Sequence, residues 1–327
     1  MHVFIIRRLL LIIPTVFLAS LIVFFAIRLI PGSVVDLMES QYSLYYNVPR
    51  DVIEQRLGLD VPILTQYGRW IGVVPQANGS FKGVLEGSLG ESIWHANSVL
   101  KDQIGPRWPV SLELAILGLL ISMVIALPIG IFSALRQDTW GDYVARSFAI
   151  LCIAVPSFWL GTLAIVYPSI WWNYTPPLMY VSFPADPIKN LSMFIIPSIV
   201  LGMGMAGITM RMTRTMMLEV LRQDYVRTAW AKGLRERVVV TRHALKNALI
   251  PVITIIGMQV SFLIGGEVII ENIFGLPGLG RLIVTATQDR DYTVVSGVIL
   301  IFAFVMVLFN LLVDLTYGFF DPRVTYK

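Results

Sequence analysis

The stretch Leu114–Leu135, LAILGLLISMVIALPIGIFSAL, contains no charged residue. As an α-helix it is long enough to cross about 30 Å of hydrocarbon. The whole chain of 327 residues is 56% hydrophobic and only 14% charged, with a mean hydropathy of +0.73. A soluble domain carries about one quarter charged residues. Lipid is therefore the main solvent of this chain, and we expect an all-α polytopic membrane protein.

Five more uncharged windows of similar length predict six transmembrane helices in total. They are Leu9–Ile27, Ser147–Trp172, Asn190–Met210, Asn247–Gly266 and Tyr292–Val313. The first runs without interruption from Arg8 to Arg28, which favours a retained helix over a signal peptide. Prolines 14, 128, 156, 168, 197 and 251 fall within these windows or at their edges. Neighbouring helices can satisfy the backbone groups that proline leaves unpaired, so we expect kinks there.

The distribution of lysine and arginine predicts the orientation, because short loops rich in these residues stay in the cytoplasm. Nine basic residues stand against three acidic ones between Arg211 and Lys246, whereas the loop Glu267–Asp291 is net acidic. Six crossings then place both termini in the cytoplasm. The formal charge of +4 is explained by this topology, without nucleic acid as a partner.

Residues 31–107 have the composition of a soluble segment, and the predicted topology places them outside as a small external module. Val52–Gly58 predicts a short helix ended by glycine, and Pro62–Trp70 a second one opened by proline. We expect four regions: 1–30 with the first helix, the module 31–107, a permease domain 108–318 and a tail 319–327.

Motifs for catalysis are missing from the sequence. It has no Gly-Lys dipeptide and hence no P-loop, and its three histidines are far apart. The single cysteine, Cys152, excludes an internal disulfide or a cysteine metal cluster and is best explained as a small buried or lipid-facing residue. We therefore expect no catalytic residue, no metal site and no cofactor bound by this chain.

The segment Leu221–Val238, LRQDYVRTAWAKGLRERV, predicts a helix that Gly233 ends in a left-handed conformation. A second helix, Glu236–Ala248, leads back into the membrane. Together they form an elbow (residues 218–250) with Tyr225, Ala229 and Gly233 on one face. A DNA-reading motif is disfavoured because both ends are tethered to the membrane. Binding to anionic lipid headgroups is a second alternative, but a surface of small residues favours docking into a protein groove.

The elbow resembles the cytoplasmic loop of binding-protein-dependent ABC importer permeases, whose pattern is Glu-Ala-Ala, three residues and Gly. Arg227–Gly233 keeps the second alanine and the glycine. Asp224–Leu234 and His243–Pro251 are similar to the dipeptide, oligopeptide and nickel subfamily. Further stretches of the same subfamily cover nearly the whole chain: Arg7-Arg8, Ser88–Gly90, Glu271–Gly280, Arg290–Tyr292, Asn310–Asp314 and Asp321–Arg323.

This resemblance implies the type I ABC importer permease fold in a bacterial or archaeal cytoplasmic membrane. The chain would pair with a homologous second permease to form the pore, and its elbow would sit on one of two cytoplasmic ATPases that hold ATP and Mg. An external solute-binding protein would deliver the solute. The residues implied in ATPase coupling are Asp224, Tyr225, Arg227, Thr228, Ala229, Lys232, Gly233, Leu234 and Arg235.

Candidates for the pore wall or an outer gate are glycines, carboxylates and one turn: Gly202, Gly204, Gly265, Gly266, Glu267, Glu271, Pro277, Gly278 and Gly280. Glycines in helices also serve close packing, and carboxylates at helix ends can simply reach interfacial water.

The cargo stays open between di- or oligopeptides, nickel complexes and other small solutes. Two other classes of protein were weighed. A secondary transporter should carry intramembrane ionisable residues at mid-depth, and a channel a filter loop or charged rings. The sequence shows almost no ionisable residue at mid-depth, and it shows neither a filter loop nor a charged ring.

Overall fold

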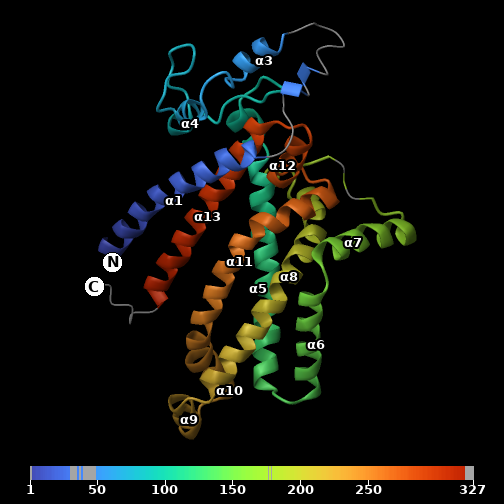
Figure 1. Ribbon diagram of the computed structural model, residues 1–327. Coiled ribbons are helices and arrows are strands. Elements are labelled where there is room, and N and C mark those ends of the chain that lie inside the picture. Colours follow the sequence, from blue (N-terminus) through green and yellow to red (C-terminus); the bar gives the residue numbers. More distant parts are fainter. Residues whose placement is uncertain are drawn as a thin grey trace. The chain divides into compact units, whose positions relative to one another are not determined.

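The computed structural model describes residues 2–29, 35–36, 38–39, 49–175, 177 and 179–320 (Figure 1). These residues form helices and connecting segments, and the described ranges contain no β-strand beyond one isolated bridge between Glu91 and Ser98. The longer helices are α1 (His2–Arg28), α5 (Trp108–Leu135), α6 (Trp140–Ala154), α7 (Ser157–Trp172), α8 (Pro187–Leu221), α11 (Leu245–Phe274), α12 (Leu279–Gln288) and α13 (Tyr292–Phe320). The tail motif Asp321–Arg323 lies outside the described residues.

Shorter helices make up the rest. The module contains α3 (Arg50–Arg56), α4 (Ile63–Ile71), the 3-10 turn η1 (Val84–Glu86) and the π-helical turn η2 (Val99–Ile104), and the elbow contains α9 (Asp224–Ala231), α10 (Glu236–Val238) and the π-helical turn η3 (Val239–Ala244). Both helices predicted in the module are confirmed. Gly58 follows α3 with φ +65°, and Pro62 precedes the first residue of α4.

The all-α membrane fold is confirmed. Five described helices are long and apolar enough to cross a membrane: Leu10–Arg28, Trp108–Leu135, Pro187–Leu221, Glu236–Val260 and Tyr292–Val313. Two further pairs are bent, namely α6 with α7 by 95° and Val268–Phe274 with α12 by 86°. Counting α6 and α7 as one broken span reproduces the six predicted crossings.

The window Ser147–Trp172 is not one straight helix. Val155 ends α6 in an extended conformation, with φ −84° and ψ 120°, and α7 begins after Pro156. The proline ring disfavours the α-conformation in the residue before it, which explains the break. The other five prolines of the predicted spans lie inside continuous helices.

The chain divides into two compact parts that do not follow chain order. One contains Met1–Leu9, Ser111–Gly280 and Met306–Lys327, and the other Leu10–Val110 and Arg281–Val305. In the first part α5, α6, α8 and α11 run side by side, and α9 lies at the end where α8 stops (Figure 1). Buried residues of three helices form one core there: Ala126, Ala149, Cys152, Ala206 and Met210. Cys152 is thus a buried packing residue.

In the second part, the buried carboxylate of Asp291 connects the module to the start of α13. It accepts hydrogen bonds from the Ser92 hydroxyl at 2.6 Å, the Ile93 amide at 3.1 Å and the Val294 amide at 3.2 Å. The Trp94 indole donates to the carbonyl of Asp289 at 2.7 Å. Two sequence stretches about 200 positions apart therefore form one joint.

Candidate functional site

The first complete helix of the elbow, α9, ends as the sequence predicts. Gly233 has φ +77°, a left-handed conformation that favours glycine. Its amide donates to the carbonyl of Trp230 at 2.9 Å, and the amide of Leu234 reaches back to Ala229 at 3.5 Å. This is the Schellman arrangement, which satisfies the last carbonyls of a helix. The turn after α9 is therefore fully specified by local chemistry.

Ala229 does not lie on the elbow surface, where the sequence analysis expected it. It is only 5% exposed and packs with the fully buried Val226 and Val239, next to Val220 and Leu221. Helical spacing alone cannot say whether a small face turns outward or inward. The small side chain at this position lets α9 pack closely against η3.

The other coupling candidates are exposed: Asp224, Tyr225, Arg227, Thr228, Lys232, Gly233, Leu234 and Arg235. Asp224 and Arg227 form an ion pair at 3.5 Å, but both are so exposed that water screens it. The exposed surface also carries further basic side chains that the sequence analysis counted only for topology: Arg222, Arg237, Arg242 and Lys246. The elbow thus presents a strongly basic surface around a rigid turn.

Tyr225 ties the two limbs of the elbow together. Its hydroxyl accepts a hydrogen bond from Asn247 Nδ2 at 2.7 Å and lies 3.4 Å from the carbonyl of His243, to which it donates. The second limb is helical from Glu236 onward, as predicted, although η3 adds a π-helical turn before α11. The sequence alone gives Asn247 no role in the elbow, because nothing local marks its partner 22 positions away.

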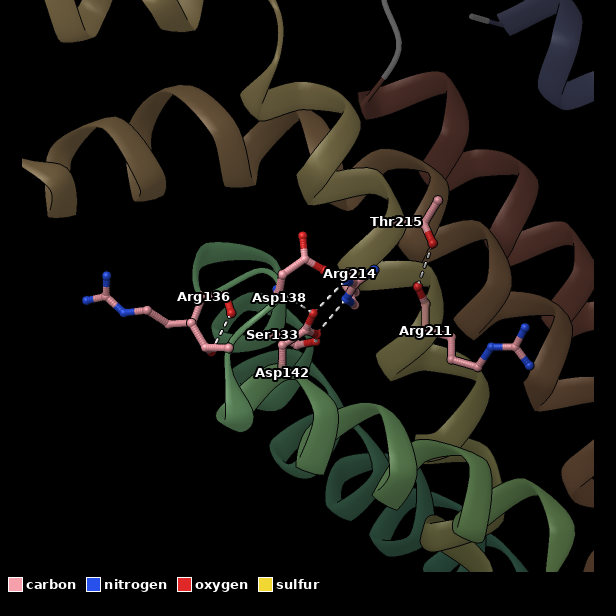
Figure 2. A network of polar contacts seen from close by, with 8 residues as sticks. Ser133, Arg136, Asp138, Asp142, Arg211, Arg214 and Thr215 are labelled. Atoms are coloured by element: carbon pink, nitrogen blue, oxygen red, sulfur yellow. Dashed lines mark hydrogen bonds and ion pairs between the residues drawn. The ribbon is translucent and has the colours of Figure 1, made fainter.

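A buried ion pair fixes the helix that leads into the elbow (Figure 2). The guanidinium of Arg214 on α8 binds the carboxylate of Asp142 on α6. Ser133 of α5 donates to the same carboxylate at 2.5 Å, and the backbone amide of Asp138 does so at 3.1 Å. The Asp142 side chain is completely buried, so two guanidinium nitrogens, the Ser133 hydroxyl and the Asp138 amide replace its hydration. Nothing in the sequence alone marks Asp142 or Ser133 as functional candidates.

A second buried carboxylate lies at the opposite end of α5. Glu271 on α11 is 0% exposed and accepts a hydrogen bond from Ser111 Oγ at 2.5 Å. The same hydroxyl accepts from the amide of Leu279, the first residue of α12, at 2.8 Å. Glu271 therefore does not reach interfacial water, and the role weighed for it in substrate contact stays a prediction. The geometry makes it an anchor of the turn Pro277–Gly280.

The two glycines of this turn make room for that carboxylate. A Cβ atom added to Gly278 would collide with the Glu271 carboxylate, and one at Gly280 would lie 3.0 Å from Glu271 Oε2 and 2.5 Å from the backbone of Val268. From the sequence these glycines are candidates for an outer gate, and that role stays a prediction. The structure shows that close packing against Glu271 requires them.

The remaining pore candidates differ in their surroundings. A Cβ on Gly202 would lie 2.7 Å from the carbonyl oxygen of Gly118, so this glycine serves helix packing between α8 and α5. A Cβ on Gly204 would meet no atom within 4 Å. For Gly265, Gly266 and Glu267 the structure describes only their place in the backbone of α11.

Among the residues that the structure describes, no group of three or more His, Cys, Asp or Glu side chains could hold a metal ion.

Comparison with known proteins matches residues 126–326 to the family "Binding-protein-dependent transport system inner membrane component" and residues 1–115 to its N-terminal counterpart. The chain is 36% identical to the dipeptide transport system permease protein DppB of Escherichia coli K12, over 99% of both chains. It is 38% identical, over the full length of both, to a Brucella abortus protein provisionally named a peptide transport system permease.

Its fold is similar to that of the MetNI methionine ABC transporter in an inward-facing conformation. The TM-score is 0.54 at 16% sequence identity, and the match covers 65% of this chain and 94% of that one. The similarity extends the sequence match to the arrangement of the helices. The chain therefore belongs to the family of binding-protein-dependent transport system inner membrane components, the permease subunits of ABC importers.

Proposed function

We propose that this chain forms half of the pore through which an ABC importer takes up di- or oligopeptides, and that the elbow couples it to an ATPase. The observation that carries the coupling is the elbow itself. It combines a basic exposed surface with a turn fixed by Gly233 and with limbs joined by Tyr225 and Asn247. A rigid projection of this kind can pass a displacement to the helices it belongs to. The names of the relatives DppB and the Brucella permease support peptides as cargo.

The proposal includes the partners and the place of the chain in the cell. A homologous second permease completes the pore, two cytoplasmic ATPases bind ATP and Mg, and an external solute-binding protein delivers the peptide. The chain itself is not catalytic and binds no cofactor or nucleic acid. The excess of arginine and lysine around the elbow supports a cytoplasmic position of the elbow and both termini in the cytoplasmic membrane.

Mild solubilisation of the tagged chain tests the assembly. We expect a second permease and two ATPase subunits to co-purify, and the reconstituted assembly to import a labelled dipeptide when ATP is supplied inside and no ion gradient is present. Uptake that follows an ion gradient and ignores ATP would instead identify a secondary transporter.

The cargo needs a separate measurement, because the same family of permeases also suits nickel complexes and other small solutes. Unlabelled di- and tripeptides should compete with the labelled dipeptide for uptake, whereas chelated nickel should not. Competition by nickel alone would reject the peptide assignment while leaving the coupling proposal intact.

A further inference from the structure

Helix α5 is fastened at both ends by serines that bind buried carboxylates. Ser111 lies in its first turn and Ser133 near its end, and they are only 4% and 2% exposed. Each donates a 2.5 Å hydrogen bond, Ser111 to Glu271 and Ser133 to Asp142. Both carboxylates are 0% exposed. The two attachments are roughly 33 Å apart along the helix axis, about the thickness of the hydrocarbon core.

The attachment at the C-terminal end of α5 reaches the first limb of the elbow. Asp142 joins Ser133 to Arg214 of α8 (Figure 2), and the last turn of α8 is the start of the elbow. An apolar cluster extends the same joint to the second limb: Ala134 of α5 packs with Met217, Val240, Ala244 and Ala248. The apolar contacts are not directional, whereas the ion pair and the serine hydroxyl specify one geometry.

The attachment at the N-terminal end reaches the turn Pro277–Gly280. The Ser111 hydroxyl donates to Glu271 and accepts from the amide of Leu279, so it joins α5 to α11 and to the start of α12 at once. Gly278 and Gly280 hold the backbone of the turn against the same carboxylate. A shift of α5 along its axis must therefore move this turn or break these bonds.

Between its ends, α5 packs tightly on α8. A Cβ on Gly202 would lie 2.7 Å from the carbonyl oxygen of Gly118, and one on Gly130 would lie 2.9 Å from the carbonyl oxygen of Met210. Backbones in such close contact cannot slide past each other without separating. These contacts hold α5 and α8 together between Gly118 and Gly130, whereas the end of α5 beyond Gly130 is joined to α8 through Ser133 and Asp142.

We propose that α5 is a strut that carries displacement of the elbow to the turn Pro277–Gly280, with Ser133 and Ser111 as the positioning residues that fasten its two ends. This inference rests on the proposed coupling function of the elbow. Hydrogen bonds to charged groups are among the stronger hydrogen bonds in a water-excluded interior. Both serine–carboxylate contacts should therefore keep their geometry when the elbow moves.

The test is a double-mutant cycle with Ser111→Ala and Ser133→Ala in the complete complex, reconstituted with its ATPases and solute-binding protein. The readout is the number of ATP molecules hydrolysed per solute imported. Sites this far apart change independent properties additively. We expect each single variant to raise the ratio roughly tenfold to a hundredfold, which is what losing one hydrogen bond to a charged group predicts. The double variant should be no worse than the worse single variant, because the two bonds act in series in one path and the second loss adds little to the first.

Thermal unfolding separates a role in transmission from a role in packing alone. The decreases in Tm of the two single variants should add in the double variant, whereas their increases in the ATP-per-solute ratio should not. Ser122→Ala is the matched control, because Ser122 is a third buried serine of α5, at 1% exposure, away from both ends. Its coupling ratio should equal that of the wild type. Coupling losses that multiply in the double variant, or unchanged coupling in both singles, would overturn the strut.

Failure of the proposed function gives a different result. If the elbow does not couple to an ATPase, the wild-type chain assembles without ATPase subunits or imports without using ATP. If only the strut is wrong, the wild-type complex couples normally and the cycle alone fails.

Discussion

The guanidinium of Arg214 donates two parallel hydrogen bonds to the carboxylate of Asp142, from Nε to Oδ1 at 2.8 Å and from Nη2 to Oδ2 at 2.7 Å. Asp142 is fully buried and Arg214 is 20% exposed. This bidentate geometry suits arginine and not lysine, whose ammonium is a single point charge. It joins two helices at the base of the elbow.

Removing one partner of this pair should destabilise the protein strongly. Asp142→Asn leaves the Arg214 charge partly buried without its counter-ion, which costs about 3 kcal/mol. Arg214→Lys keeps the charge but loses one of the two parallel bonds, so we expect a smaller loss of about 1 kcal/mol. Thermal unfolding of the purified chain in detergent measures both. Equal stability of Asp142→Asn and the wild type would show that the pair contributes little.

Substitutions at Gly233 should act through the backbone and not through contacts. Its φ of +77° strains any other residue, while a Cβ there would meet no atom within 4 Å. Gly233→Ala should therefore cost about 1 kcal/mol, and Gly233→Asn less, because asparagine tolerates the left-handed region.

ATP-driven uptake by the same Gly233 variants tests the elbow turn. We expect uptake to fall in the order glycine, asparagine, alanine and valine, since each step loosens the turn further. Uptake by Gly233→Val at the wild-type level would remove this residue from the coupling surface.

Gly278 in the turn before α12 and Gly204 in α8 should respond in opposite directions to substitution by alanine. Gly278→Ala places a methyl group in the space that the Glu271 carboxylate occupies. Overpacking of this kind should lower the free energy of unfolding by about 1–3 kcal/mol. A Cβ atom on Gly204 of α8 would meet no atom within 4 Å. Gly204→Ala should therefore stabilise this helix by about 1 kcal/mol, because alanine has the higher helix propensity. Chemical denaturation compares them directly. A stabilising Gly278→Ala would mean that the turn does not rest on Glu271.

Glu113→Gln should stabilise the chain. The Asn190 amide donates to Glu113 Oε2 at 3.2 Å and to the carbonyl of Val181 at 3.0 Å. Glu113 Oε1 and Asn190 Oδ1, in contrast, are buried acceptors without a hydrogen-bond partner among the described residues. A glutamine amide supplies donors and no charge, which we expect to add about 1 kcal/mol.

The unfolding midpoint of Glu113→Gln at neutral pH checks this, with Glu113→Ala as the control that removes the side chain. We expect Gln to rise above the wild type and Ala to fall below it. A midpoint for Gln at or below that of Ala would show that the ionised carboxylate is needed.

Much of the fold could be predicted because its causes are local. Lipid leaves no partner for a free backbone amide, so each uncharged window such as Leu114–Leu135 had to be helical. The left-handed end of α9 at Gly233 and the break before Pro156 likewise depend on single residues and their neighbours. The size of the 95° bend depends on packing against other helices and was not predictable.

The sequence by itself determined the helices, the turn of the elbow and the family to which the chain belongs, since composition and short motifs carry that information. Only the tertiary structure decided which polar groups share a site. Asp142 and Arg214 are 72 positions apart, and Ser111 and Glu271 are 160. The tertiary structure also buries Ala229. Helical periodicity predicts which residues share a face, but not which other segment that face packs against. Burial makes such pairings strong, and burial is a property of the folded chain.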